Sequence, residues 1–368
     1  MPPGARSLAP VRPADRSPAR PGVGVVIVTY RSEPALRRTL PALLAELGPD
    51  DQLVVVDNAS GDGTLAAARE MAPAAEVVAN PTNIGFAAAA NQGAALTRTE
   101  IVLLLNPDAA PAPGFGAAIR RPWEDRRGWA AWQGLVTAEE GRVVNTSGGV
   151  VHFTGIAWAG EAGVSLDAAS PTRREAGFAS GACLAVTRAA WEATGGFRPG
   201  FFMYCEDVDL SLRLRLAGER VGVEPAARVD HEYEFAKGAA KWRRLEANRW
   251  RVLVGVYPTP LLVLLAPALL ATELALLPAA FAAGWGRQKV EAMVEVAADL
   301  PGLLRERRAI QRTARLPVAT FASWLVPELS SRYLGRIGRL RPLGALLRLY
   351  WRLVLLLLRR LSRTRASA

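Results

Sequence analysis

The sequence predicts an α/β fold with a mostly parallel sheet, followed by a helical C-terminal region. From residue 23 onward, short apolar runs alternate with helical patterns at about 25 residues per unit, which is typical of right-handed βαβ crossovers. Half of the 368 residues are apolar, so the chain can bury a full core. The net charge of +11 lies at the C-terminal end, because residues 284–368 contain 17 Lys and Arg against 5 Asp and Glu.

The first half of the chain reads as strand–helix units. Residues 1–21 are rich in Pro and Arg, lack the apolar run of a secretory signal and are expected to be disordered. Strands are predicted at residues 23–30, 52–57, 76–80 and 101–105, and helices at 33–47, 64–71 and 86–96. The carboxyl ends of parallel strands meet at one edge, so we expect Tyr30, Asp57, Asn83 and Asp108 to converge there.

The apolar strand at residues 101–105 is stopped by Asn106 and Pro107, which leaves Asp108 at the sheet edge. A carboxylate there can hold a cation or the metal of a diphosphate. The alternative is ordinary Asx-Pro-Asp turn chemistry. No Walker loop and no G-x-G-x-x-G after the first strand is present, which disfavours kinase-like NTPases and dinucleotide enzymes.

The middle of the chain changes pattern. Residues 128–153 predict short antiparallel strands, 161–175 a mobile loop and 177–187 a further strand. We interpret His152 as a packed strand residue rather than a ligand. Cys183 and Cys205 have no metal or disulfide spacing and are expected to be free thiols, which places the folded domain in a reducing compartment.

A second polar group follows at residues 201–213, an apolar stretch that ends as a helix. Glu206 and Asp207 lie in its first turn, where the helix dipole alone favours acids. The apolar residues before them also suit a general base, so both interpretations stay open. A strand is predicted at residues 220–224, and His231 follows on a short connection, either as a metal ligand or as an ordinary loop histidine.

In combination and order, these motifs resemble family 2 glycosyltransferases with the GT-A fold, in the branch that includes rhamnosyltransferases and other cell-surface polysaccharide enzymes. The resemblance covers residues 23–251. The matching segments are residues 25–32 (VVIVTYRS), Asp57 in VVVDNASGDGT, residues 83–87 continuing to Asn91, residues 106–108, the turn at 195–197, the helix at 206–213, His231 and residues 247–249.

This resemblance implies an inverting enzyme that moves a sugar, such as rhamnose or another hexose, from a nucleoside-diphosphate sugar to a lipid-linked or cell-surface glycan in a single displacement. The implied donor-binding residues are Thr29, Tyr30, Ser32, Asp57, Asn83, Asn91, Asn106 and Asp108. Asp108 and His231 would bind a divalent metal, Mg²⁺ or Mn²⁺, and Asn rather than Asp at position 106 removes one charge from that site.

The same resemblance assigns Asp207 as the general base, with Glu206 as its helper. Asn248 and Arg249 would contact the acceptor or a phosphate. Two alternatives remain. A sugar nucleotidyltransferase would need a Gly-rich basic loop after the first strand, and residues 29–33 are not such a loop. A non-catalytic, membrane-associated nucleotide-sugar-binding protein would leave the converging acids unexplained.

The C-terminal region predicts a membrane partner and no nucleic acid, because its arginines alternate with leucine-rich runs. The apolar run at residues 252–283 could cross a bilayer, but it contains four prolines and Glu273. A single span would carry the basic tail across the membrane against the positive-inside tendency, so we favour a re-entrant or in-plane hairpin; a single span and a buried core helix are the alternatives.

Residues 343–358, with Arg348 and Arg352 among leucines, suit a helix lying in the membrane interface. The expected organisation is therefore a GT-A domain at residues 22–251, a hydrophobic membrane segment at 252–283 and a basic amphipathic helical tail at 284–368. Together with the free thiols, this places the protein on the cytoplasmic face of the cell membrane.

Overall fold

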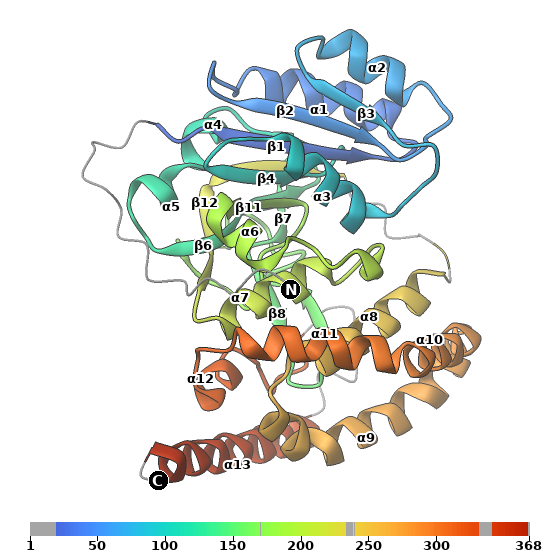
Figure 1. Cartoon of the computed structure of the whole chain (residues 1–368), viewed down its shortest axis with the longest axis vertical. Helices are drawn as coiled ribbons and strands as arrows, with labels where there is room; N and C mark the ends of the chain where they lie inside the picture. The colour runs from blue at the N-terminus through green and yellow to red at the C-terminus, as the bar shows by residue number, and fades with distance from the viewer. Residues whose placement is uncertain (1–19, 170, 233–237, 239, 331–340, 367–368) are drawn as a thin grey trace, which may run out of the picture.

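The computed structural model describes residues 20–169, 171–232, 238, 240–330 and 341–366 of the chain. A ten-stranded sheet with flanking helices occupies one end of the molecule, and a set of long helices occupies the other (Figure 1). Most of the segment predicted to be disordered, residues 1–19, lies outside the described residues, as does part of the predicted tail, residues 331–340.

The predicted alternation of strands and helices in the first half is confirmed. Its elements are β1 (Val23–Thr29), α1 (Glu33–Leu44), β2 (Gln52–Asp57), α2 (Thr64–Met71), β3 (Glu76–Ala79), α3 (Phe86–Leu96) and β4 (Ile101–Leu105). The four strands are parallel in the order β4–β1–β2–β3. Val25 and Ile27 share a core with the leucines of α1, whereas Val26 and Val28 share one with the alanines of α3, so both faces of the sheet are covered.

The middle segment adds strands to the other side of β4. Its elements are β5 (Ala109–Pro111), α4 (Phe115–Ala118), α5 (Arg121–Glu124), β6 (Trp129–Ala138), β7 (Val143–Thr146), β8 (Gly149–Val151), β9 (Ala157–Ala159), β10 (Arg174–Glu175), β11 (Cys183–Thr187) and α6 (Arg188–Thr194). β11 is antiparallel to both β4 and β6, which confirms the expected antiparallel additions. β8 and β9 form a separate hairpin, and His152, which follows β8, is buried.

The last strand is longer than predicted. After η1 (Pro199–Phe201) and α7 (Glu206–Leu216), β12 runs from Arg220 to His231. The expectation that it ends at Glu224, with His231 on a connection, is wrong. The ladder with β6 shifts register between Glu224 and Arg228, where Pro225 lies, and an irregularity of this kind is one of the few places where a sheet tolerates proline. His231 therefore lies in the sheet, paired with Ala109 of β5.

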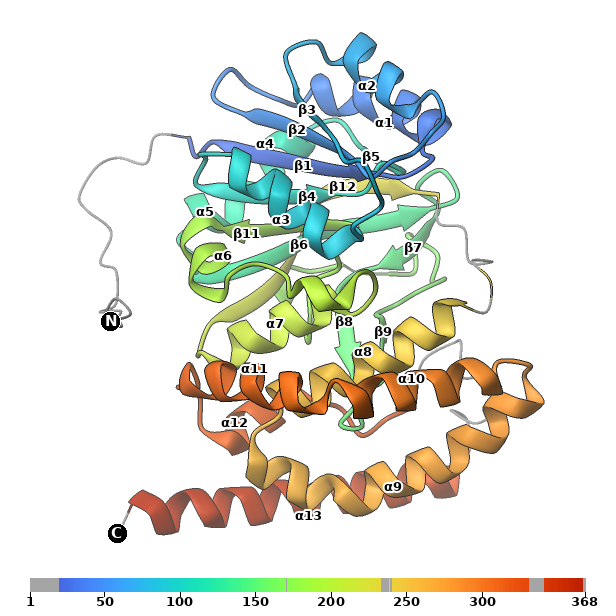
Figure 2. The ribbon, with the colours of Figure 1, turned by 45° about the vertical axis from the view of Figure 1, so that its right-hand side comes forward.

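The C-terminal region is helical. It consists of α8 (Ala240–Val256), α9 (Thr259–Ala282), α10 (Gly286–Ala298), α11 (Leu300–Arg312), α12 (Val318–Ala322) and α13 (Arg341–Ala366). The predicted domain boundary between residues 251 and 252 falls inside α8. In Figure 2, α9 and α13 lie side by side at the base, below α10 and α11. Among the described residues, α9 is the one helix that is long and apolar enough to cross a membrane.

Four charged side chains, of which all but the half-buried Glu273 are buried, join three of these helices. We call them the basal charge cluster: Glu246 and Arg249 of α8, Glu273 of α9 and Lys289 of α10. The Lys289 side chain has no exposed surface, and its Nζ lies 2.5 Å from carboxylate oxygens of both Glu246 and Glu273. Arg249 contacts the same two acids, at 2.9 Å from Glu246 Oε2. Two acids and two bases thus neutralise each other, which a buried set of charges requires.

Replacing Lys289 by Met should reduce the free energy of unfolding by roughly 3–5 kcal/mol, because it leaves an excess of negative charge in a buried site. Chemical denaturation of the purified protein in detergent measures this. The control is Arg287→Met, two residues away on the same helix but 86% exposed, which should change stability little. Equal stability of the two variants would contradict the prediction.

Candidate active site

The ends of β4 and β12 bring three of the predicted site residues together. His231 Nε2 lies 2.9 Å from Asp108 Oδ1 and 3.3 Å from Asn106 Nδ2. The His231 side chain is 4% exposed, whereas Asp108 keeps 23% of its surface open to solvent. The residues that the resemblance assigns to the metal and the donor's diphosphate thus lie together, and His231 reaches them from a strand.

This donor set can hold a divalent cation only with outside ligands. No group of three or more His, Cys, Asp and Glu side chains is suited to a metal within the part of the chain that the structure describes. One carboxylate and one imidazole leave most positions of such an ion to other oxygens. The pair therefore fits a cation that also binds a phosphate-bearing ligand at the open side of Asp108.

Asp57 is held rigidly at the end of β2. It is 4% exposed and accepts hydrogen bonds from Thr29 Oγ1 at 3.0 Å and from Ser60 N at 3.1 Å. Thr29 has no exposed surface, so it positions the Asp57 carboxylate from inside the protein. Tyr30, the next residue, is 46% exposed, and Ser32 Oγ donates to its carbonyl at 3.1 Å. This edge offers an exposed ring beside a fixed carboxylate.

The segment after β3 is shaped by close contacts. Asn83 Oδ1 accepts a hydrogen bond from Gly85 N at 2.9 Å, and Gly85 has φ +86°. A Cβ at Gly85 would lie 2.7 Å from the Phe202 ring, so only glycine fits. Asn91 Oδ1 accepts a hydrogen bond from Phe197 N at 2.9 Å, and Asn91 Nδ2 donates one to the Phe197 carbonyl at 2.7 Å. These two bonds fix α3 to the turn at residues 195–197.

The carboxylate pair of Glu206 and Asp207 lies next to the end of β4, where Asn106 and Asp108 follow. Asp207 Oδ2 accepts a hydrogen bond from Gly181 N at 2.9 Å, and the carbonyl of the following residue, Ala182, accepts from Asn106 N at 3.0 Å. Two consecutive backbone groups thus connect Asp207 with the end of β4. Asp207 is partly exposed and Glu206 is buried, so Asp207 is the member of the pair that a ligand can reach.

Burial raises the pKa of the Asp207 carboxyl above its ordinary value, although backbone N–H groups of Gly181 and Val208 oppose the shift. Burial, followed by the charge of Asp207, raises the pKa of Glu206 to about 8. Glu206 Oε2 has no hydrogen-bond partner among the described residues. Near pH 7 Glu206 therefore holds its proton beside Asp207.

The loop before this pair is strained and is held from α8. Phe202, Tyr204 and Cys205 have φ values of 58°, 71° and 62°, and such left-handed residues cost about 1–3 kcal/mol each. Asn248 Nδ2 lies 2.9 Å from the carbonyl oxygens of both Phe201 and Met203 and 2.7 Å from that of Tyr204. The amide therefore fixes the loop that positions Glu206 and Asp207.

Arg249, the residue after Asn248, is 3% exposed. It belongs to the basal charge cluster and also donates a hydrogen bond to the Thr154 carbonyl. Asn248 and Arg249, predicted to contact acceptor or phosphate, thus both have partners inside the protein. Later along α7, Asp209 and Arg213 form an i, i+4 ion pair at 2.7 Å. Burial opposes ionisation of Asp209, but Arg198 and Arg213 hold its pKa below the ordinary value.

Three polar groups at the site were not predicted. Arg38 Nη2 donates to the Asp108 carbonyl at 3.2 Å and pairs with Glu232. Ser60 fixes Asp57, and the backbone N–H of Gly181 fixes Asp207. Ser60 lies three residues after Asp57 in an Asx- and Gly-rich turn, which is a usable signal. Nothing in the sequence around Gly181 or Arg38 indicates their partners.

The fold and the site define an α/β enzyme of the GT-A class, and comparison with known proteins gives the family. The family described as "Glycosyltransferase like family 2" matches residues 21–252. The chain belongs to this family of inverting glycosyltransferases, which confirms the resemblance seen in the sequence.

Known relatives and solved structures agree with the family assignment. The chain is 31% identical to N-acetylglucosaminyl-diphospho-decaprenol L-rhamnosyltransferase of Mycobacterium tuberculosis over an alignment of 251 residues. The alignment covers 61% of this chain and 80% of the relative. Two solved structures share the fold: S. aureus TarS, with a TM-score of 0.50, 15% identity and coverage of 92% of this chain and 91% of that one, and GalNAc-T7 with UDP, GalNAc and Mn²⁺, with a TM-score of 0.51, 16% identity and coverage of 64% and 48%.

The Glu206 side chain generates a pH prediction. Its pKa rises from an ordinary 4.5 to about 8 on folding, so the folded state holds this proton more tightly, and the free energy of unfolding falls as pH rises from about 4.5 to about 8. Glu206→Gln cannot lose a proton there. Its stability relative to the parent should therefore increase from pH 5 to pH 8, measured by denaturant unfolding. Glu140→Gln, at an 84% exposed side chain, should give a flat difference; a flat difference for Glu206→Gln would refute the shift.

Proposed function

We propose that this protein transfers rhamnose, or a related hexose, from a nucleoside-diphosphate sugar to a lipid-linked glycan acceptor at the cytoplasmic face of the membrane. The observation that carries the proposal is the position of Asp207, a partly exposed carboxyl group joined through Gly181 and Ala182 to the end of β4. The sugar and the acceptor class rest on the name of the mycobacterial relative.

The donor would lie along the carboxyl ends of the parallel strands, with its base near Tyr30 and Asp57 and its diphosphate near Asp108. Asp207 would accept the proton of the acceptor hydroxyl while that oxygen attacks the anomeric carbon from the face opposite the diphosphate. The bond from the anomeric carbon to the diphosphate oxygen breaks, and its electron pair leaves with the nucleoside diphosphate. A single displacement of this kind inverts the anomeric configuration.

Glu206, protonated near pH 7, would keep a second negative charge away from Asp207 and support its orientation. Asp108 and His231 are the residues that would hold Mg²⁺ or Mn²⁺, with Asn106 beside them. When bound, such a cation offsets the negative charge that grows on the leaving diphosphate.

The membrane part of the proposal rests on the base of the molecule. Four apolar side chains of α9, Val263, Leu270, Leu274 and Phe281, are 60–67% exposed, and their spacing puts them on one face. Leu346, Leu349 and Leu353 of α13 are 52–62% exposed and also share a face. α9 and α13 lie next to each other, so these faces form one apolar surface, which we call the base. An exposed apolar surface of this extent suits a membrane interface.

Asp207→Asn should retain donor binding and lose turnover by roughly two to four orders of magnitude, because a general base acts on the acceptor. Asp108→Ala should instead lose the stabilisation by nucleotide sugar that depends on Mn²⁺. Thermal shift against a panel of nucleotide sugars, with and without metal, and turnover on a lipid-linked acceptor measure both effects. Near-normal turnover in Asp207→Asn would mean that another residue is the general base. An unchanged response to metal in Asp108→Ala would mean that Asp108 is not part of the donor site.

Changing both Leu349 and Leu353 to Asn should reduce binding to vesicles that contain anionic lipid by roughly tenfold or more, because two leucine side chains lose a favourable transfer from water. Co-sedimentation with vesicles measures the loss. Leu44→Asn, at a 39% exposed leucine of the sheet domain, is the matched control and should bind like the parent. If the double variant partitions like this control, the base is not the membrane surface.

A further inference from the structure

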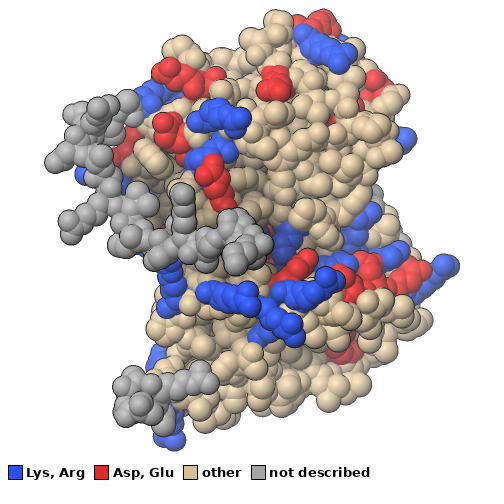
Figure 3. Space-filling model, in the orientation of Figure 1, with Lys and Arg blue, Asp and Glu red and all other residues tan. Residues whose placement is uncertain are grey.

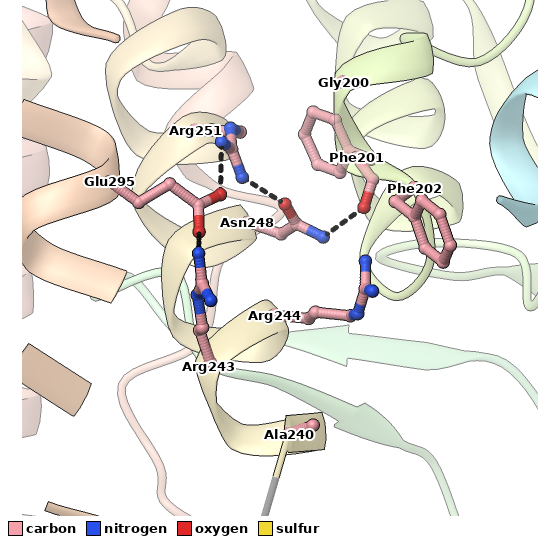
Figure 4. Close-up of a pocket in the computed structure, with 9 residues that line it drawn as sticks. All are labelled: Gly200, Phe201, Phe202, Ala240, Arg243, Arg244, Asn248, Arg251 and Glu295. Carbon is pink, nitrogen blue, oxygen red and sulfur yellow. Dashed lines mark hydrogen bonds and ion pairs between the residues drawn. The ribbon is translucent and has the colours of Figure 1, made fainter. Parts of the chain in front are cut away.

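A cavity of about 270 Å³ opens between the strained loop at residues 200–202 and the helices α8 and α10 (Figure 4). Its charged lining residues are Arg243, Arg244 and Arg251 of α8 and Glu295 of α10. Three arginines against one glutamate give this lining a formal charge of +2. We call it the arginine pocket. A diphosphate that links two organic groups carries the opposite charge at neutral pH.

The three arginines differ in how far they are neutralised. Arg243 and Arg251 share Glu295, at 2.8 and 2.7 Å from its two carboxylate oxygens. They also approach Glu291 and Asp299 loosely, at 3.9 and 4.0 Å. Arg244 has no carboxylate partner among the described residues. Its guanidinium lies over the Phe202 ring, 3.8 Å from the ring centroid, and is partly buried, which lowers its pKa through desolvation.

A partly desolvated guanidinium without an acid is costly unless a ligand supplies the anion. Stacking on a ring leaves the N–H groups in the guanidinium plane available, and this planar fork matches two phosphate oxygens at once. In Figure 4 the Arg244 side chain extends from α8 toward the loop that carries Phe202. Arg244 is thus the residue of the pocket best suited to an incoming phosphate.

The pocket lies between Asp207, the candidate general base, and the apolar surface formed by α9 and α13. Asn248, which lines the pocket, holds the loop that ends at Glu206 and Asp207. On the other side, α8 and α10 pack together and α10 packs on α9, whose outer face is apolar. In Figure 3, charged side chains gather at the level of α8 and α10, and the surface over α9 below them is largely uncharged.

We propose that the arginine pocket binds the diphosphate that joins the acceptor sugar to its lipid, with Arg244 as the main contact. An acceptor seated in this way would present its sugar toward Asp207 and its lipid chain toward α9 and α13. This inference rests on the proposed function for the identity of the acceptor. The donor also has a diphosphate, but the residue proposed to lie near it, Asp108, does not line the arginine pocket.

The test uses the full chain in detergent, with farnesyl diphosphate as a probe of the pocket and EDTA present to silence any metal site. Arg244→Gln should bind the probe roughly tenfold or more weakly than the parent, because it loses a charge-assisted bidentate contact. Arg244→Lys, which keeps the charge without the fork, should lie between. Arg287→Gln, at an exposed arginine of α10 outside the pocket, should bind like the parent.

Kinetics separate the possible sources of the diphosphate. Arg244→Gln should raise KM for a prenyl-diphosphate-linked acceptor by a similar factor, and it should raise KM for the donor and KM for an alkyl glycoside of the same sugar far less. A matching rise in the donor KM would assign the pocket to the donor and overturn the inference, as would probe binding that is the same in Arg244→Gln and Arg287→Gln. Probe binding that depends on Arg244 in a protein with no turnover on any nucleotide sugar would support the pocket and refute the proposed function.

Discussion

The interaction on which much of the structure depends is the basal charge cluster. Bringing Glu246, Arg249, Glu273 and Lys289 out of water is expensive, and only their mutual pairing offsets that cost. Each acid contacts both bases, so no member can move alone without leaving another buried and unpaired. Because the four residues come from α8, α9 and α10, the cluster fixes the direction in which each helix faces the next.

The cluster reaches the active site through a single helix. Asn248 and Arg249 are neighbours on α8 and point in different directions, Arg249 into the cluster and Asn248 toward the strained loop before Glu206. Left-handed residues such as Tyr204 persist only where the surroundings impose them, and the Asn248 amide does so here. The position of the proposed base Asp207 therefore depends on packing among C-terminal helices that lie outside the sheet. This dependence explains why the boundary predicted after residue 251 falls inside a continuous helix.

The sequence was sufficient for the parallel half of the fold because strand and helix periods alternate there without interruption, and strand ends then place Asp57 and Asp108 by topology alone. It was insufficient for β12, where Pro225 looked like a strand end but occupies an irregularity in the ladder. The roles of Asn248 and Arg249 also could not be read locally, since their partners Tyr204 and Thr154 lie 44 and 95 residues away. Short patterns report the element that contains a residue, but not the distant backbone group that uses its side chain.

The same cluster bears on how α9 would meet a membrane. Glu273 is the one charged residue of this helix, and it faces Arg249 and Lys289. Crossing the bilayer would either pull Glu273 away from both cations or carry them into the hydrocarbon with it, and each course is costly. Lying in the interface keeps the cluster intact and still turns the exposed face of α9, with Leu270 and Leu274, toward the lipid. An in-plane arrangement would therefore satisfy both the buried charges and the exposed leucines, and it would place the arginine pocket at the depth of the lipid headgroups.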